Sequence, residues 1–208
     1  MITAISLMRR RDDVPLNEFR RHWLDVHGPL VCMFPALRDY VQCHVLASPA
    51  TNDLARSMQI DGFPLLTFAN DEDRAQAHGS AAMAACNEDS TLFIGAVARI
   101  MAEPDDVVAV TERADRARLM VLYPEGFDGA SIARHVDQLC ALPRLRGLRR
   151  YTVLQQGRAP NSVIPHLQVN AAAVVQGWFD SLVDLECAAA AIEFPGIASF
   201  ACEEHRLA

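Results

Sequence analysis

Hydrophobic residues recur along the chain with two different periods, and segments of one period alternate with segments of the other. Residues 2–8 form a short apolar run followed by charged residues, which is typical of a strand. Beyond Pro15, with Asn17 as the expected N-cap, apolar side chains recur every three or four residues up to Pro35, which indicates a helix. Residues 40–46 alternate between two faces and predict a second strand.

The remainder of the first half adds two strands and a helix. Residues 51–59 are polar and are expected to form a loop. Residues 62–68 and 97–103 predict strands, and the alanine-rich residues 71–85 predict a helix. The element order is therefore β-α-β-β-α-β. Residues 104–106 and the polar stretch 111–116 are expected to link this unit to the second half of the chain.

The second half repeats the order of elements and some side chains of the first. Strands are predicted at residues 119–123, 148–155, 171–179 and 197–202, and helices at 129–142 and 181–191. The matching side chains are Phe19, His27 and Pro35 with Phe127, His135 and Pro143, then, after an expected three-residue insertion, Tyr40 and Phe68 with Tyr151 and Phe179, and finally Glu103 with Glu203. We therefore predict an internal duplication, with a first domain over residues 1–110 and a diverged second domain over residues 117–208.

A β-α-β-β-α-β unit is the ferredoxin-like motif, an antiparallel sheet that carries both helices on one face. The other face of such a sheet is bare and has to be covered by apolar surface. A second copy of the same sheet covers it most simply, and fusing two copies makes this pairing intramolecular. The expected fold is therefore α+β, with tandem ferredoxin-like repeats whose antiparallel sheets form a barrel-like core.

Composition and charge narrow the classes of function. Of the 208 residues, 51% are apolar and 22% are charged, which is typical of a globular protein with a full core. A formal net charge of -7, without a basic cluster, argues against binding to nucleic acid or to anionic membranes. We find no apolar run long enough to cross a bilayer, and the first apolar stretch is too short for a secretory signal.

The cysteines indicate a reducing compartment. All six stand far apart in the sequence and none belongs to a C-x-x-C pair, so we expect reduced, mostly buried thiols in a cytoplasmic protein. The sequence contains no H-x-H or H-E-x-x-H motif for a metal, and no G-x-G-x-x-G or Walker motif for a nucleotide. We therefore expect neither a metal nor an organic cofactor.

One segment of the first half resembles a known family. The motif F-x-x-x-W-x-x-x-H-G-P-L, which begins at Phe19, and the motif Y-x-Q-x-H, which begins at Tyr40, resemble the EthD family of dimeric α+β barrels. The second half resembles a diverged member of the family, which keeps His135 but lacks the tryptophan, the Gly-Pro pair and the last histidine. The resemblance implies the fold. It does not choose among the lactone isomerases, polyketide cyclases, decarboxylases, cofactor-free oxygenases and distant haem enzymes of related barrels.

His27 is the first catalytic candidate. It follows Trp23 by four residues, so it shares the apolar face of the predicted helix and should point inward. In a water-poor pocket, a neutral imidazole can take a proton from a carbon next to a carbonyl group. The pattern alone fits equally a buried histidine that satisfies a backbone carbonyl. The resemblance favours catalysis, because this histidine is a hallmark of the family.

Tyr40, Gln42 and His44 share one face of the predicted strand. If that face lines the interior, Tyr40 and Gln42 would bind the substrate and His44 would be the second acid-base group; if it faces solvent, the three side chains merely contact water. We expect the interior, with Val41 and the other apolar residues packed beneath the helices. Trp23 either belongs to the core or also contacts the substrate.

His135 is expected to be a partly exposed relic of His27, so the predicted site lies in the first half. The predicted function is that of a cofactor-free isomerase, cyclase or lyase that uses histidine acid-base chemistry on a small carbonyl-bearing compound, either aromatic-derived or a lactone. A cofactor-independent oxygenase and a non-catalytic small-molecule-binding protein remain alternatives, and a haem protein is a more remote one. The protein is expected to be a monomer or a homodimer.

Overall fold

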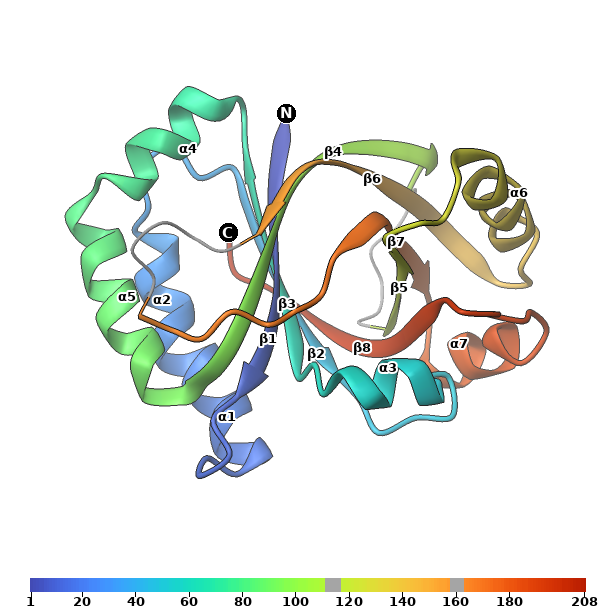
Figure 1. Cartoon of the computed structure of the whole chain (residues 1–208), viewed down its shortest axis with the longest axis horizontal. Helices are drawn as coiled ribbons and strands as arrows, with labels where there is room; N and C mark the ends of the chain where they lie inside the picture. Colours follow the sequence, from blue (N-terminus) through green and yellow to red (C-terminus); the bar gives the residue numbers. More distant parts are fainter. Residues whose placement is uncertain (111–116, 158–162) are drawn as a thin grey trace.

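The computed structural model describes residues 1–110, 117–157 and 163–208, and the predicted order of strands and helices is present in both halves (Figure 1). The expected linker at residues 111–116 lies outside the described residues. The strands are β1 (Ile2–Arg10), β2 (Asp39–Val45), β3 (Gly62–Phe68), β4 (Ile94–Val108), β5 (Ala117–Pro124), β6 (Leu145–Gly157), β7 (Ala171–Phe179) and β8 (Ala198–Arg206). The helices are α1 (Leu16–His22), the π-helical turn η1 (Trp23–His27), α2 (Gly28–Cys32), α3 (Asp53–Met58), α4 (Asp71–His78), α5 (Ala81–Phe93), α6 (Gly129–Cys140) and α7 (Leu182–Ala189).

One predicted helix start and one predicted loop were wrong. α1 begins at Leu16, directly after the extended N-cap residue Pro15, and Asn17 lies inside the helix instead of capping it. Residues 51–59 are not a loop throughout. The Asn52 side chain accepts the N–H of Ala55 and starts α3, a cap that the polar composition of this stretch concealed.

Two further boundaries differ from the predictions. The helix expected over residues 71–85 is two helices, because Ser80 caps a second one that runs on to Phe93. β4 continues through residues 104–106, which were expected to begin the linker. Two ion pairs hold this extension on β6, Asp105 with Arg150 and Asp106 with Arg149.

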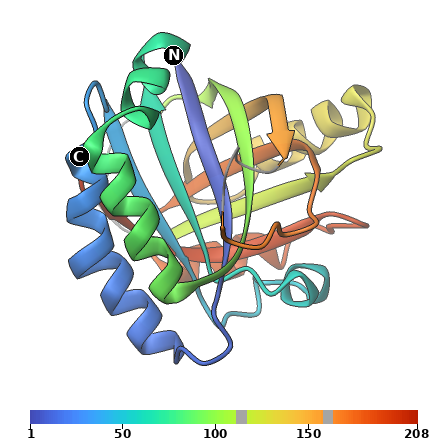
Figure 2. The same cartoon turned by 60° about the vertical axis from the view of Figure 1, so that its left-hand side comes forward.

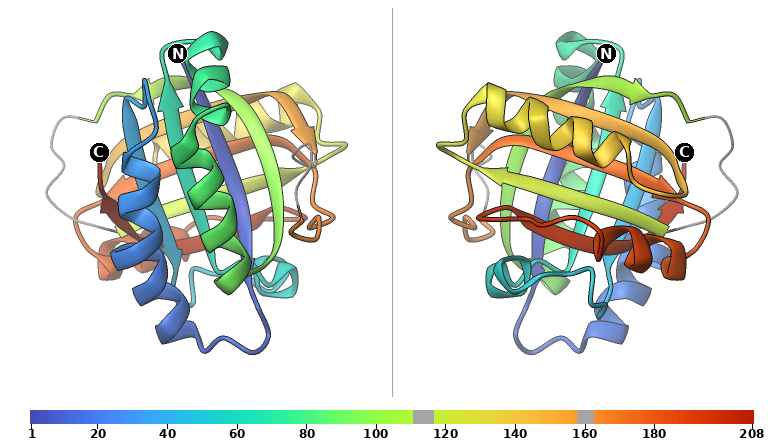
Figure 3. Two further views of the ribbon diagram at one scale, coloured as in Figure 1. Left: turned by 90° about the vertical axis from the view of Figure 1, so that its left-hand side faces the viewer. Right: turned by 90° about the vertical axis from the view of Figure 1, so that its right-hand side faces the viewer.

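The strands confirm the predicted α+β barrel. Each half has the ferredoxin-like strand order, β4-β1-β3-β2 in the first and β8-β5-β7-β6 in the second. Antiparallel pairing of β2 with β8 and of β4 with β6 then closes the two sheets into one barrel. Figures 2 and 3 show α1, α2 and α5 on the outside of the first sheet, and α6 and α7 on the outside of the second.

Both faces of the first sheet are buried, each in a different cluster. Inside the barrel, Ile5 and Cys43 from the first half pack with Met120 and Phe200 from the second. Outside it, beneath the helices, Trp23 belongs to a cluster that also includes side chains of β1 and β4 and Ile164 from the second half. Side chains of one strand alternate between these two environments, which we call the barrel side and the helix side.

The strand register corrects one part of the predicted repeat. Tyr40 pairs with Leu66, whereas Leu148 pairs with Gly177, the residue related to Leu66 by the same offset that relates Phe179 to Phe68. Leu148 is therefore the structural counterpart of Tyr40. Tyr151 belongs to the barrel-side cluster instead. No insertion separates the helix from the strand, and the match between the two tyrosines was coincidental.

Among the described residues, no helix combines the length and apolar character needed to cross a membrane. All six cysteines are unpaired. The expectation that most are buried holds for Cys43, Cys86 and Cys202 only, because Cys32 and Cys187 are exposed and Cys140 is intermediate. The cytoplasmic location stays a prediction.

Candidate functional site

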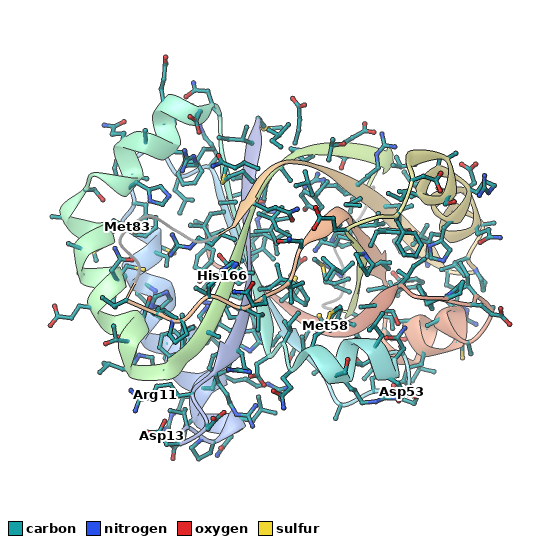
Figure 4. The ribbon with its side chains drawn as sticks, viewed as in Figure 1. Arg11, Asp13, Asp53, Met58, Met83 and His166 are labelled. Carbon is teal, nitrogen blue, oxygen red and sulfur yellow. The ribbon has the colours of Figure 1, made fainter. Side chains whose placement is uncertain are left out.

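A cavity of about 250 Å³ lies in the first half, between the helix side of the sheet and the helices that cover it. Met83, labelled in Figure 4, lines it from α5. The apolar lining residues are Ala4, Met8, Val31, Phe34, Pro64, Leu66, Met83, Ile94, Val97, Met101 and Ile164. The polar ones are Ser6, His27, Tyr40, Arg74, His78, Cys86, Asn87, Ser90, Arg99, Gln155 and Gln156.

The second half also lines this cavity, with Gln155, Gln156 and Gly157 of β6 and with Ile164 of residues 163–170, which we call the strap. In Figure 1 the strap passes in orange across β4 before it enters β7. The N–H of Val97 donates to the carbonyl of Pro165 (3.0 Å), and the carbonyl of Val97 accepts the N–H of Leu167 (3.1 Å). These bonds hold Ile164 against the cavity, where it packs in the cluster of Trp23.

Pro29 accounts for the change of winding that places His27. Proline lacks an N–H, and its ring collides with the carbonyl four residues earlier in a regular α-helix. The helix instead widens into the π-turn η1, in which the N–H of Gly28 donates to the carbonyl of Trp23. Turns of this kind are frequent at functional sites. The side chains of Trp23 and His27, at the two ends of the turn, are both buried.

Both ring nitrogens of His27 have partners. Asp89, from α5, accepts a hydrogen bond from Nδ1 (2.8 Å), and its other oxygen accepts one from Nε2 of His22 (2.9 Å). A carboxylate can only accept, so Nδ1 carries the proton and Nε2 bears the lone pair. Nε2 lies 3.4 Å from Sγ of Cys86. Cys86, His27 and Asp89 are thus connected in series, and the Asp89 carboxylate fixes the tautomer in which His27 can act as a base.

Burial sets the protonation state of this group. Desolvation lowers the pKa of His27 and outweighs the opposing effects of Asp89. Desolvation, together with the charge of Asp89, raises the pKa of Cys86 to about 12. At neutral pH, His27 is therefore an uncharged base and Cys86 is a thiol that donates to it. Within the described residues, no group of three His, Cys, Asp or Glu side chains could hold a metal ion.

Four predicted site residues form one hydrogen-bonded network. The Tyr40 hydroxyl accepts from Nε1 of Trp23 (3.1 Å) and from Nε2 of Gln42 (2.8 Å), and the same Gln42 nitrogen also donates to the carbonyl of Trp23 (2.9 Å). Oε1 of Gln42 accepts from Nε2 of His44 (2.9 Å). The His44 ring stacks on Trp23, with centroids 4.3 Å apart and planes 5° apart.

The predicted orientation of this strand was wrong, although both of its faces are buried. Val41 and Cys43 point to the barrel side, whereas Tyr40, Gln42 and His44 lie beneath the helices. Of these three, only Tyr40 lines the cavity. The catalytic role of His44 stays a prediction. Its environment is that of a packed, neutral imidazole, because desolvation and the charges of His205 and Arg20 lower its pKa to about 3.

His135 is buried, not exposed as predicted. Nδ1 accepts from the Tyr123 hydroxyl (2.7 Å), and Nε2 donates to the carbonyl of Glu193 (3.2 Å). At Nδ1 a phenol therefore takes the place that Asp89 has at His27, and at Nε2 a backbone carbonyl takes the place of Cys86. Both ring nitrogens of His135 are satisfied by the fold itself, so its contacts are structural.

Several residues in or next to the cavity escaped the sequence analysis. Cys86 and Asp89 stand three residues apart on one face of α5, a spacing that could have drawn attention to them. His78 lines the cavity with Arg74 and Arg99. Desolvation and the charges of these two arginines lower the pKa of His78. Only the folded chain brings β4, α4 and α5 together, so no local pattern links these residues.

Part of the chain matches a known protein family. Residues 11–96 match the EthD domain, a segment shorter than half of the chain that contains His27, Tyr40, Cys86 and Asp89. No curated protein matches the chain.

Three solved structures are similar. An anthrone oxidase-like protein is 9% identical and has a TM-score of 0.62, with 99% of this chain and 93% of that chain covered. A provisionally named monooxygenase from Lactobacillus acidophilus is 10% identical and has a TM-score of 0.52, with 98% and 93% covered. An EthD family protein from Bacillus halodurans is 22% identical and has a TM-score of 0.42, with 50% of this chain and 97% of that chain covered. The first two share the fold over the whole chain.

Proposed function

Because the first half of this chain contains an EthD domain, we propose that its cavity is the active site of a cofactor-free isomerase, cyclase or lyase. The substrate would be a small carbonyl-bearing compound, aromatic-derived or a lactone. The observation that carries the proposal is His27, a neutral imidazole at the cavity wall whose Nδ1 is fixed by Asp89 and whose Nε2 bears the lone pair. A neutral imidazole held in one tautomer by a carboxylate is suited to proton transfer at carbon.

The proposed step is the transfer of one proton. A substrate C–H next to a carbonyl group takes the place at Nε2 that the Cys86 thiol occupies in the structure. His27 accepts the proton, the electron pair of the C–H bond moves into the carbonyl group to form an enolate, and Asp89 stabilises the imidazolium. Return of the proton to a different carbon completes an isomerisation, and loss of a leaving group instead completes an elimination.

Tyr40 is the proposed donor to the enolate oxygen. Its hydroxyl already accepts two hydrogen bonds, from Trp23 and Gln42, so its own proton remains for an acceptor in the cavity. Burial raises the pKa of Tyr40, which keeps this proton on the phenol. Donors fixed before the reaction stabilise developing negative charge most effectively. Trp23, Gln42 and His44 would act through Tyr40 as positioning residues.

The test is solvent exchange at carbon. In deuterium oxide, the wild-type protein is expected to introduce deuterium next to the carbonyl group of lactones or phenol-derived ketones, detected by mass spectrometry. His27→Gln should abolish the exchange, and Tyr40→Phe should slow it about 10- to 1000-fold. Asp89→Asn should also slow it, since the fixed tautomer is lost. Normal exchange by His27→Gln would refute the assignment of the base.

The same test separates the alternatives. A cofactor-independent oxygenase is the second candidate, favoured by the oxidase-like and monooxygenase names of two proteins that share the fold over the whole chain. It predicts oxygen consumption with anthrones or dihydroxyaromatic compounds, measured with an oxygen electrode in the absence of added metal or flavin. A non-catalytic binding protein would bind such compounds saturably, with neither exchange nor oxygen uptake.

A further inference from the structure

The charged side chains that line the cavity are positive, whereas the net charge of the chain is negative. The protein has 26 acidic and 19 basic residues, Lys and Arg taken together, and a net charge of -7. Its cavity is nevertheless lined by two arginines, Arg74 and Arg99, and two histidines, with no Asp or Glu among the described lining residues. Asp89 does not line the cavity, and it is hydrogen-bonded to His22 and His27. A ligand in the cavity would therefore meet positive potential.

Arg99 is the charge in the cavity wall for which the described residues provide no counter-charge. It lies on β4 between Ser6 of β1 and Gly157 of β6, both of which also line the cavity. Its side chain is half-buried, and desolvation lowers its pKa, yet no described residue forms a hydrogen bond or an ion pair with it. By contrast, Arg118, also buried, has a bidentate ion pair with Glu204. A desolvated guanidinium without a partner is costly unless a ligand supplies the counter-charge.

The neighbours of Arg99 do not supply that counter-charge. Arg74 reaches the cavity from α4, but its Nε is paired with Asp71 (2.7 Å). His78 is the next cavity residue on α4. Its pKa is lowered by desolvation and by both arginines, so at neutral pH it is an uncharged imidazole close to Arg99. The three side chains thus form one corner of the cavity, and of the two arginines there Arg99 is the one without an ion pair to a described residue.

We propose that this cavity binds an organic anion and that Arg99 receives its carboxylate. The substrate class of the proposed reaction is then a small carboxylic acid with a single ring, and this part of the inference rests on the proposed function. A planar guanidinium matches a carboxylate through two parallel N–H bonds, which gives orientation as well as affinity. The ring would lie against the apolar wall formed by Val31, Phe34 and Met83. A cavity of about 250 Å³ suits one ring rather than several.

The experiment compares two probes of nearly the same shape, benzoate and benzamide, by isothermal titration calorimetry at pH 7.5. Wild-type protein is expected to bind benzoate about 10- to 100-fold more tightly, the range of one charge-assisted hydrogen-bonded pair. Arg99→Gln should remove this preference, and Arg99→Lys should retain part of it. Arg144→Gln, which removes the same charge from an exposed ion pair in the second half, should leave the preference unchanged.

A second readout uses the protein's own groups. The NMR signals of the Met83 methyl group and of the His78 ring should shift on addition of benzoate, and the pKa of His78 should rise when a carboxylate lies beside it. Equal affinity for both probes in wild type, absence of binding by either, or full preference in a folded Arg99→Gln protein would each overturn the proposal. If benzoate binds through Arg99 while no carbon acid undergoes exchange, the anion site stands and the proposed reaction fails.

Discussion

Acidification should destabilise this protein through His44, and the size of the effect can be worked out from its surroundings. The ring is 2% exposed, stacked on Trp23, and has a pKa of about 3 instead of the ordinary 6.5. Since the unfolded chain binds the proton at a higher pH than the folded chain, stability falls as the pH drops below about 6.5 and continues to fall until about 3. Between pH 7 and pH 4.5 the expected loss from this residue alone is about 2.5 kcal/mol, an order-of-magnitude figure.

The assay is urea unfolding at 25 °C, followed by tryptophan fluorescence, at half-unit steps from pH 7 to pH 4.5. His44→Gln is the matched variant, because its amide can still donate to Oε1 of Gln42 but cannot titrate. Burial also lowers the pKa of His27, His78 and His135, so both proteins should lose stability in acid. The wild type should lose about 2.5 kcal/mol more than the variant. Parallel curves would show that His44 can be protonated in the folded state and would refute the argument.

Two further substitutions test the packing and the chemistry of the site. A Cβ on Gly62 would lie 2.3 Å from Cζ3 of the buried Trp23 ring, so Gly62→Ala should lower the free energy of unfolding by about 1–3 kcal/mol. Gly129→Ala is the control, because a Cβ there meets open space, and it should change the free energy of unfolding very little in the same urea titration. The pKa of about 12 for Cys86 predicts that iodoacetamide at pH 8 modifies Cys86 far more slowly than the exposed Cys187, as measured by mass spectrometry. Equal rates would mean that Cys86 is a thiolate paired with His27, and would argue that it is a nucleophile instead of a proton donor.

The elements that the sequence predicted best are short apolar runs bounded by polar residues. Residues 62–68 and 171–179 were predicted with the bounds that β3 and β7 have, and His27 was correctly expected to point inward. The faces of β2 could not be assigned, because both are buried in a closed barrel. An alternation of period two shows that Tyr40 and Val41 lie on opposite faces of the strand, but it does not show which of them faces the barrel side and which the helix side.

The remaining site residues depend on tertiary contacts that no local pattern encodes. Asp89 meets His27 only because α5 packs beside the π-turn, and Arg99 reaches the cavity from a strand to which the sequence assigned no site residue. The strap is another example. Ile164 belongs to the second half of the sequence but lies in a cluster made otherwise of first-half side chains. Its position depends on backbone bonds to Val97, which the sequence of either half alone does not predict.

The strap also bears on how such a protein can change over generations. In a symmetric pair of identical chains, each mutation appears in both subunits, so both sites must tolerate it together. Here a mutation in the strap alters the cover of the His27 cavity and leaves the surroundings of His135 with their own set of contacts. The second half can therefore change while the cavity residues of the first half are kept, an asymmetry that a homodimer of this fold cannot adopt.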